Sequence, residues 1–143
     1  MNKRFAVLGE DARMRAAARA LAGAGQTLAE PEKADCILLG VRLGENSPDL
    51  ALALARARPG TQLFGGAVSP GAAALARAAG FVLRDYMEWE ELAVLNAIPT
   101  AEGCLALLLQ DRRRTLWGSP VLLLGYGRVG QAAALRLAAL GAR

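Results

Sequence analysis

Short apolar runs alternate with stretches of helical periodicity over the first part of the chain. Phe5–Leu8, Cys36–Leu39 and Thr61–Phe64 are short, mostly apolar runs followed by glycine, which is typical of buried strands. Between the first two, Met14 and Leu21 recur at a spacing that puts them on one face of a helix. The pattern predicts strands at residues 5–8, 26–28, 36–39, 61–64 and 81–83, with helices over 12–24, 47–58 and 69–79.

Two of the predicted helices begin with the same pair of residues. Ser47-Pro48 and Ser69-Pro70 each place a hydroxyl at the N-cap and a proline at the first helical position, where the missing N–H is not needed. Strands separated by helices at this spacing favour a parallel sheet with helices on both faces. We therefore predict an α/β fold with a doubly wound parallel sheet, a flavodoxin-like N-terminal domain over residues 1–98.

The chain changes character after Glu88. Residues 89–95 show a helical pattern, which Pro99 is expected to end because a proline disfavours the α conformation of the residue before it. Thr100 is then placed to cap a second helix, whose leucines surround most of its circumference, as in a helix buried between two bodies. Residues 99–118 are assigned to an inter-domain crossing helix and turn.

A glycine motif follows the next apolar run. Val121–Leu124 is expected to form a strand and Gln131–Leu140 a helix, and a G-x-G-x-x-G sequence between a strand and a helix is typical of dinucleotide binding. The first glycine permits a tight turn, the second lets the backbone approach a pyrophosphate, and the third lets helix and strand pack closely. Residues 119–143 are therefore predicted to be the truncated start of a Rossmann domain, with a plain βα turn as the alternative. The candidate cofactor-binding residues are Gly125, Tyr126, Gly127, Arg128, Val129 and Gly130.

The composition excludes several classes of catalytic and binding site. The 143 residues carry a net charge of +4 and no histidine, which excludes a histidine base and most zinc sites from this segment, and we expect no metal. Cys36 and Cys104 lie in apolar segments without metal-ligand spacing and are expected to be buried thiols. The run Arg112-Arg113-Arg114 lacks the patterned face of a nucleic-acid surface, so no nucleic-acid partner is expected.

Hydropathy and the N-terminus bear on location. The mean hydropathy of +0.26 rests on alanine, and no run of about 18 apolar residues is free of a charge or a Pro/Gly break, so no membrane association is expected. The first residues lead into an apolar run without the features of a signal peptide. A cytoplasmic location is expected.

Several segments resemble the A subunits of bacterial dipicolinate synthase. They are the octapeptide Asn96–Gly103, Thr115–Ser119, and the run from Val121 to Gly130. The opening Val7–Arg13 is similar to that family's start, Gly-Gly-Asp-x-Arg, with Glu10 in place of the second glycine, where the backbone is expected to differ. The resemblance covers both ends of the chain and is thin between residues 30 and 80. The layout of a crossing helix that enters a Rossmann domain also resembles D-2-hydroxyacid dehydrogenases and adenosylhomocysteinase.

The resemblance implies an NADP-dependent oxidation of a dihydrodipicolinate-type ring to dipicolinate during sporulation. It implies a flavoprotein-like B subunit as partner, a small dicarboxylate as substrate, and action in the cytoplasm of the mother cell. NAD stays open as the cofactor, because the residue that separates NAD from NADP lies beyond Arg143. The fragment alone is expected to be inactive. Homo-oligomer formation is left open, as is whether the chain naturally ends at residue 143.

Two arginines are candidates to bind the substrate. Ligands of open α/β sheets bind beyond the carboxyl ends of the strands, and Arg13 and Arg42 follow two of the predicted strands. The planar guanidinium pairs with a carboxylate through two hydrogen bonds, as a dicarboxylate requires. The alternative for each is a solvated surface arginine.

Four further residues are candidates for the reaction. Asn96 and Thr100, expected where the domains meet, are placed to orient the substrate or the nicotinamide, or else to cap the crossing helix. Asp11 and Glu102 are the candidate catalytic residues, because a proton must leave the ring and there is no histidine to accept it. Glu102 is otherwise a partner of the helix dipole.

An enzyme subunit is therefore the leading interpretation. The alternatives are a non-catalytic assembly or interaction module, an enzyme like the D-2-hydroxyacid dehydrogenases with another substrate, and a free-standing flavodoxin-like sensor. Sequence downstream of residue 143 that supplies a second strand and a crossover favours the enzyme, whereas a stop codon there favours the module.

Overall fold

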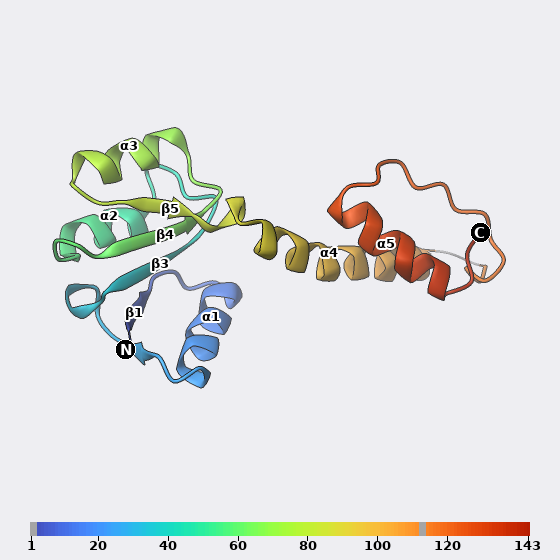
Figure 1. The fold of residues 1–143 in the computed structure, drawn as a ribbon, viewed down its shortest axis with the longest axis horizontal. Coiled ribbons are helices and arrows are strands. Elements are labelled where there is room, and N and C mark those ends of the chain that lie inside the picture. Colours follow the sequence, from blue (N-terminus) through green and yellow to red (C-terminus); the bar gives the residue numbers. More distant parts are fainter. Residues whose placement is uncertain (1–2, 112–113) are drawn as a thin grey trace. The chain divides into compact units, whose positions relative to one another are not determined.

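A computed structural model of the chain describes residues 3–111 and 114–143. The chain divides into two compact units, Met1–Glu88 and Trp89–Arg143, whose elements are labelled in Figure 1. This division falls before the expected domain end at residue 98, because the first turns of the long helix belong to the second unit. Arg112 and Arg113 of the basic run lie outside the described residues.

The first unit is built on a five-stranded sheet. All the pairings are parallel, and the strand order is β2-β1-β3-β4-β5. This order is that of the flavodoxin-like, doubly wound sheet, so the predicted fold class is confirmed. The strands are β1 (Arg4–Val7), β2 (Thr27–Leu28), β3 (Cys36–Val41), β4 (Gln62–Gly66) and β5 (Leu83–Asp85).

Helices cover both faces of this sheet. From β1 the chain passes through α1 (Ala12–Gly23) to β2 at one edge of the sheet. From β3 it passes through α2 (Pro48–Arg56) to β4 and through α3 (Pro70–Ala78) to β5 at the opposite edge. Because such crossovers are right-handed, α1 covers one face and the other two helices cover the opposite face (Figure 1). Short 3-10 turns, η1 (Pro31–Lys33) and η2 (Tyr86–Glu88), complete the unit.

The predicted helix starts are confirmed atom by atom. The Ser47 hydroxyl accepts a hydrogen bond from the N–H of Leu50 at 3.3 Å, and the Ser69 hydroxyl accepts one from the N–H of Ala72 at 3.1 Å. These bonds satisfy donors that have no partner inside a helix, which is why α2 and α3 begin where the sequence predicts.

The main core lies between the sheet and the α2/α3 layer. Ile37, Leu39 and Leu63 project from the strands into it and meet Leu50 of α2, all with essentially no exposed surface. Side chains alternate along a strand, so Cys36 points to the opposite face, and its expected burial is confirmed.

The second unit consists of two helices and an extended connection. α4 (Glu90–Asp111) packs on α5 (Arg128–Ala139). Its core is a small apolar cluster drawn from both helices and the connection: Ala101, Leu105, Leu116, Ala133 and Leu137.

The predicted helix break at Pro99 is wrong, because α4 runs through Pro99 without ending. Proline has no N–H to donate, so the turn loses one helical hydrogen bond. Next to it, the Thr100 hydroxyl donates to the carbonyl of Asn96 at 2.7 Å, which adds a bond within the same turn. Thr100 therefore does not cap a fresh helix. Packing of the helix against α5 outweighs the local preference.

The predicted strand Val121–Leu124 is also absent as a strand. The segment is irregular, with Val121 and Leu123 packed on the α4/α5 cluster while Leu122 and Leu124 are 85% and 89% exposed. This is the alternation of a strand, but a strand requires a hydrogen-bonded neighbour. The only partner found for it among the described residues is Arg143, which pairs at the first residue of the segment.

α4 is also long and apolar. By length and composition alone it is the one helix of the described residues that would be able to cross a membrane, with a mean hydropathy of 1.8 over its most apolar window. Core helices of soluble proteins meet the same criteria.

Candidate functional site

The glycine motif forms an open turn at the start of α5. Gly125 has φ of 98°, a conformation that side chains rarely adopt. Gly127 is the N-cap of α5 and has no side chain to bond the first N–H groups of the helix. A β-carbon added at Gly127 would meet no heavy atom within 4 Å, so the space over the turn is open. The first N–H groups of α5 are therefore accessible, and they are the donors that a helix N-terminus offers to an anion.

Gly130 makes the turn compact. A β-carbon at this position would collide with the carbonyl oxygen of Gly125 and would lie 3.2 Å from a methyl group of Leu123. Only a glycine lets the first turn of α5 lie this close to the loop. This is the packing role that the sequence assigned to the third glycine of the motif.

The variable positions of the motif face solvent, and one of them is paired. Tyr126 and Val129 are exposed. The Arg128 guanidinium donates through Nε to Oε1 of Glu90 at 2.9 Å and through Nη2 to Oε2 of the same carboxylate. This pairing holds the pKa of Glu90 below its usual value, mainly through the hydrogen bond from Arg128, and raises the pKa of Arg128.

A second ion pair joins the same two helices. Arg136 donates to Glu102 through Nη2 at 2.9 Å and through Nε at 3.3 Å. Glu90 precedes Glu102 on α4 as Arg128 precedes Arg136 on α5, so the two helices run parallel and their N-termini lie on the same side. Glu102, a candidate catalytic residue, thus has a structural partner within the second unit.

In the first unit, Asp11 and Arg13 lie together beyond β1. Asp11 caps α1, accepting from the N–H groups of Arg13 at 2.8 Å and Met14 at 2.9 Å. Arg13 also donates Nη2 to the Asp11 carboxylate at 3.2 Å, although its side chain is 70% exposed. The backbone N–H of Met14 is the largest cause of the lowered Asp11 pKa.

The neighbouring strands end in unusual backbone. Arg42 follows β3 with φ of 63°, and Ala67 follows β4 with φ of 49°, values that are uncommon for residues other than glycine. The Asp85 carboxylate supports the second of these by accepting from the N–H groups of Ala67 at 3.0 Å and Val68 at 2.7 Å. Strained backbone of this kind is concentrated at functional sites, and here it lies at the edge where Arg42 was predicted to act.

Tyr86 belongs to the same edge, and no sequence pattern marked it. Its hydroxyl donates to the carbonyl of Leu39 at 3.1 Å, and its ring lies where a β-carbon on Gly66 would be. Burial raises the pKa of Tyr86, while the charge of Arg13 lowers it. The available signal was its position directly after β5, at the carboxyl edge of the sheet.

The structure thus places the predicted site residues in two groups. Asp11, Arg13 and Arg42 lie beyond β1 and β3 in the first unit. Asn96 and Thr100 are exposed on α4 in the second unit, which also carries Glu102 and the glycine motif.

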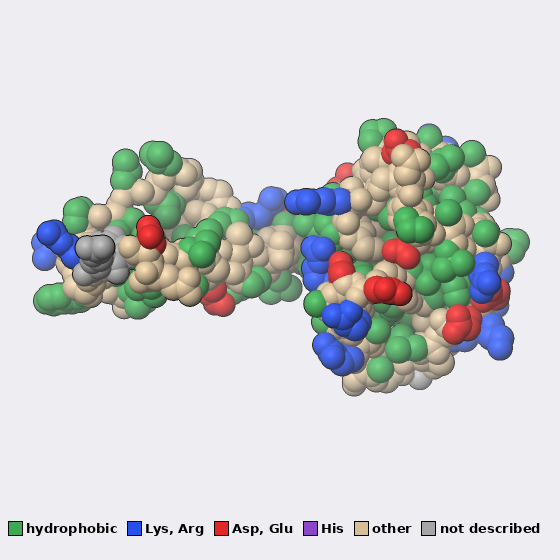
Figure 2. Space-filling model, turned by 180° about the vertical axis from the view of Figure 1, so that it is seen from behind, with side chains coloured by type: hydrophobic (Ala, Val, Ile, Leu, Met, Phe, Trp, Pro, Cys, Tyr) green, Lys and Arg blue, Asp and Glu red, His purple; other side chains and the backbone are tan. Residues whose placement is uncertain are grey.

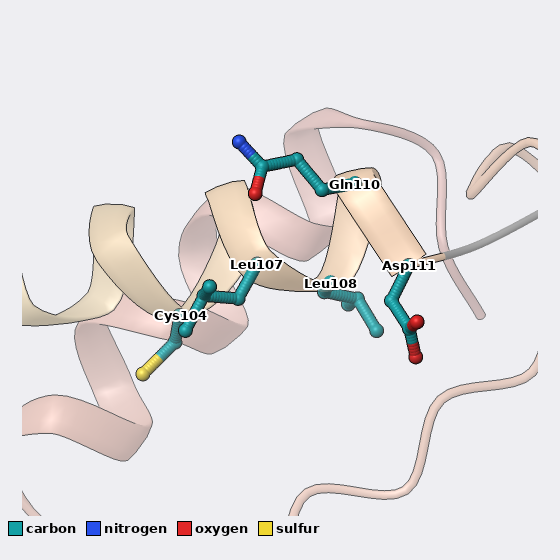
Figure 3. Close-up of a pocket in the computed structure, with 5 residues that line it drawn as sticks. All are labelled: Cys104, Leu107, Leu108, Gln110 and Asp111. Carbon is teal, nitrogen blue, oxygen red and sulfur yellow. The ribbon is translucent and has the colours of Figure 1, made fainter.

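A separate hollow of about 660 Å³ lies along the second half of α4. It is lined by Cys104, Leu107, Leu108, Gln110 and Asp111, and none of the predicted site residues lines it. Figure 3 shows the Gln110 amide pointing away from the Cys104 thiol and the Asp111 carboxylate. The expected burial of Cys104 is wrong, because its side chain is exposed on α4.

The charged side chains of the described residues bear on metal and nucleic-acid binding. Within residues 3–111 and 114–143, no cluster of three or more acidic or cysteine side chains is arranged to hold a metal ion. On the face in Figure 2, acidic and basic side chains of the first unit are interspersed. A nucleic-acid surface instead gathers its basic residues on one patch.

Comparison with known proteins confirms the resemblance to the A subunits of dipicolinate synthase. A 55-residue segment, 38% of this chain, is 46% identical to the A protein of that enzyme from Bacillus subtilis (strain 168), of which it covers 18%. The solved structure of the A protein from Bacillus subtilis matches 99% of this chain with a TM-score of 0.76 and 26% identity. That from Bacillus halodurans matches 98%, with a TM-score of 0.77 and 24% identity. No protein-family model matches the chain.

The match is to part of those proteins and includes a dehydrogenase. This chain spans 59% of the length of both solved dipicolinate synthase proteins. The apo-structure of D-lactate dehydrogenase from Escherichia coli matches all of this chain over 54% of its own length, with a TM-score of 0.52 and 14% identity, which shows the fold alone. The fold of this chain is therefore dehydrogenase-like.

Proposed function

We propose that this chain is the N-terminal part of an NADP-dependent oxidoreductase that oxidises a dihydrodipicolinate-type ring to dipicolinate. The observation that carries the proposal is the turn Gly125–Gly130. It has an unblocked helix N-terminus, open space over Gly127, and a glycine at the one position where a side chain would collide with the loop. The resemblance to the A subunits of dipicolinate synthase supplies the substrate class.

The hydrogen bonds of the last residue support a Rossmann arrangement. The N–H of Arg143 donates to the carbonyl of Ser119 at 2.9 Å, and its carbonyl accepts from the N–H of Val121 at 2.8 Å. This alternation is the pattern of a parallel strand pair. A strand, a helix and a second parallel strand beside the first make up the unit that binds dinucleotides in this fold.

In the proposed site, the backbone N–H groups at the start of α5 hold the cofactor's pyrophosphate. A dinucleotide held there would supply the acceptor for the hydride that the substrate loses. Arg128 is the nearest cation in sequence to these donors and offers a guanidinium fork to a phosphate. NADP is proposed over NAD on the resemblance alone.

The first unit is proposed to bind the dicarboxylate through Arg13 and Arg42 at the carboxyl edge of its sheet. Asp11 and Glu102 remain the proposed proton acceptors. Each is now paired with an arginine, Asp11 with Arg13 and Glu102 with Arg136. Either carboxylate must part from its arginine, at least in part, before it accepts a proton. Asn96 and Thr100 remain proposed to orient the substrate or the nicotinamide.

The proposal extends to the setting of the enzyme. The relatives are subunits of dipicolinate synthase, so a flavoprotein-like B subunit is proposed as partner. Action in the cytoplasm of the sporulating mother cell is proposed with it.

Turnover by the full-length protein tests the function. Purified protein, alone and with the B subunit, is mixed with NADP and freshly prepared dihydrodipicolinate, and NADPH absorbance and dipicolinate are followed together. We expect both products in equal amounts, with NAD as the control cofactor. NADP binding without turnover of this substrate would redirect the proposal to another dehydrogenase, and absence of any nucleotide binding would favour the non-catalytic module.

A further inference from the structure

We propose that Glu90 is a positioning residue that competes with the cofactor's pyrophosphate for Arg128. In this inference, which rests on the proposed dinucleotide site, the Glu90 carboxylate occupies the guanidinium fork of Arg128 while the site is empty. It must give up that fork when the dinucleotide binds. Glu90 thereby sets the affinity of the turn for phosphate.

The geometry of the pair is the first support. Both Nε and Nη2 of Arg128 are engaged by the two carboxylate oxygens of Glu90. Phosphate and carboxylate bind a guanidinium through the same two parallel hydrogen bonds. A phosphate that approaches the Arg128 guanidinium must therefore displace the Glu90 carboxylate, which already occupies those two donors.

The placement of the pair is the second support. Arg128 is the first residue of α5 and directly follows the N-cap Gly127. Its guanidinium is therefore attached to the same turn that carries the open N–H groups. Glu90 is the first residue of α4, whose N-terminus lies on the same side because the helices run parallel. Two parallel helices bring two positive dipole ends together, which a carboxylate at this point offsets in the absence of a ligand.

The energetics set the size of the effect. Both side chains are more than half exposed, and exposed ion pairs are weak and screened by salt. The long side chain of Glu90 can swing into water at little cost. The competition is therefore expected to change affinity by about two- to fivefold, the range of an exposed ion pair.

The test uses this chain with inorganic pyrophosphate as the probe and ¹⁵N NMR as the readout. Amide shifts of Gly127–Gly130 report binding at the turn, and the Nε–H resonance of Arg128 reports which anion occupies its fork. Glu90→Gln removes the competing charge. Glu91→Gln, the matched control, removes the same charge one residue along α4 and leaves the pair intact. Glu90→Asp keeps the charge on a shorter side chain.

We expect Glu90→Gln to bind pyrophosphate about two- to fivefold more tightly than the unaltered chain. Glu91→Gln should leave the affinity unchanged and Glu90→Asp should be intermediate. In an Arg128→Gln background, Glu90→Gln should have a clearly smaller effect, because no fork is left to compete for and only the offset of the helix dipoles by the carboxylate remains. A fingerprint spectrum of each variant shows that both units remain folded.

Two other outcomes separate the inference from the proposed function. If pyrophosphate shifts the amides of Gly127–Gly130 equally in the unaltered chain and in Glu90→Gln, the site stands and the competition is refuted. If Glu90→Gln and Glu91→Gln tighten binding equally, the effect is one of general charge and the role of Glu90 is likewise refuted. If no amide of the turn moves in any variant, the phosphate site itself is refuted, and the inference with it.

Discussion

Gly130 lies so close to the carbonyl oxygen of Gly125 that no β-carbon fits between them. The contact ties the first turn of α5 to the loop that precedes it. It also explains why the third glycine of the motif is a packing residue and does not act by contacting a ligand.

Gly130→Ala should therefore distort the turn and destabilise the second unit by about 1–3 kcal/mol, the usual cost of inserting a methyl group where there is no room. Denaturant unfolding followed by tryptophan fluorescence measures the change, since Trp89 and Trp117 both lie in the second unit. Gly103→Ala on α4 is the control, since its β-carbon would meet no atom within 4 Å. There a helical alanine should stabilise by about 0.5–1 kcal/mol. Equal stability of the two variants would contradict this account.

Leu137→Ala should destabilise the second unit by about 2–4 kcal/mol, because Leu137 is only 7% exposed in the α4/α5 cluster. Hydrogen exchange of the α5 amides measures the loss in this unit separately from the first. Leu135→Ala, two residues away and 71% exposed, should change it by less than about 0.5 kcal/mol. If both variants protect α5 equally, the two helices are not packed as described.

Tyr86→Phe should cost the first unit about 0.5–1.5 kcal/mol, since the hydrogen bond that the Tyr86 hydroxyl donates to the Leu39 carbonyl is lost. Thermal unfolding of the first unit is the measurement. Tyr126→Phe is the matched control, because its hydroxyl lies on an exposed side chain of the second unit. A Tyr86→Phe chain as stable as the unaltered one would show that water replaces the bond.

Asp35 should make the stability of the first unit depend on pH at the acid end. Hydrogen bonds from Arg4, at 3.0 Å and 3.2 Å from its guanidinium and 2.9 Å from its N–H, hold the pKa of Asp35 well below its usual value. A lowered folded-state pKa stabilises fully above the unfolded value near 4, and this stability is lost as the pH falls below it.

Unfolding curves measured from neutral to acid pH test this. Asp35→Asn should be less stable than the unaltered chain at neutral pH, and the difference should shrink toward low pH. Glu10→Gln on the exposed loop after β1 controls for the loss of one acidic side chain. A difference that stays constant with pH would show that the Asp35 charge contributes nothing.

Arg13→Ala in the full-length enzyme should lower kcat/KM. The fall should correspond to a loss of about 2–3 kcal/mol of transition-state stabilisation, the cost of losing a charge-assisted contact to a substrate carboxylate. The pairing with Asp11 leaves most of the Arg13 side chain exposed and accessible to a ligand. Arg19→Ala, on the exposed side of the same helix, is the control. Unchanged kinetics in both would assign Arg13 to the solvated surface.

Local sequence was sufficient for most elements of the first unit, although the fifth strand is Leu83–Asp85 and not residues 81–83. Hydroxyl caps such as Ser47 and Ser69 act on N–H groups three residues away, and runs such as Cys36–Leu39 are buried wherever parallel strands pair, so neighbouring residues decide both. The glycine motif was also evident, because its turn is a property of six consecutive residues. Each of these features is decided by residues that lie within a few positions of one another, which is the range over which a sequence pattern is informative.

Tertiary structure decided the rest, because it depends on residues far apart in the chain. Pro99 stays inside α4 since packing on α5 stabilises the helix more than the lost hydrogen bond weakens it. Val121–Leu124 has the alternation of a strand but lacks the ladder that would make it one, and a ladder is supplied only by another segment. Glu90 meets Arg128 across 38 positions, and no local pattern marks either as the partner of the other. The sequence alone determined most elements of the first unit and the glycine turn, whereas how those elements pack decided which charges and which strands meet.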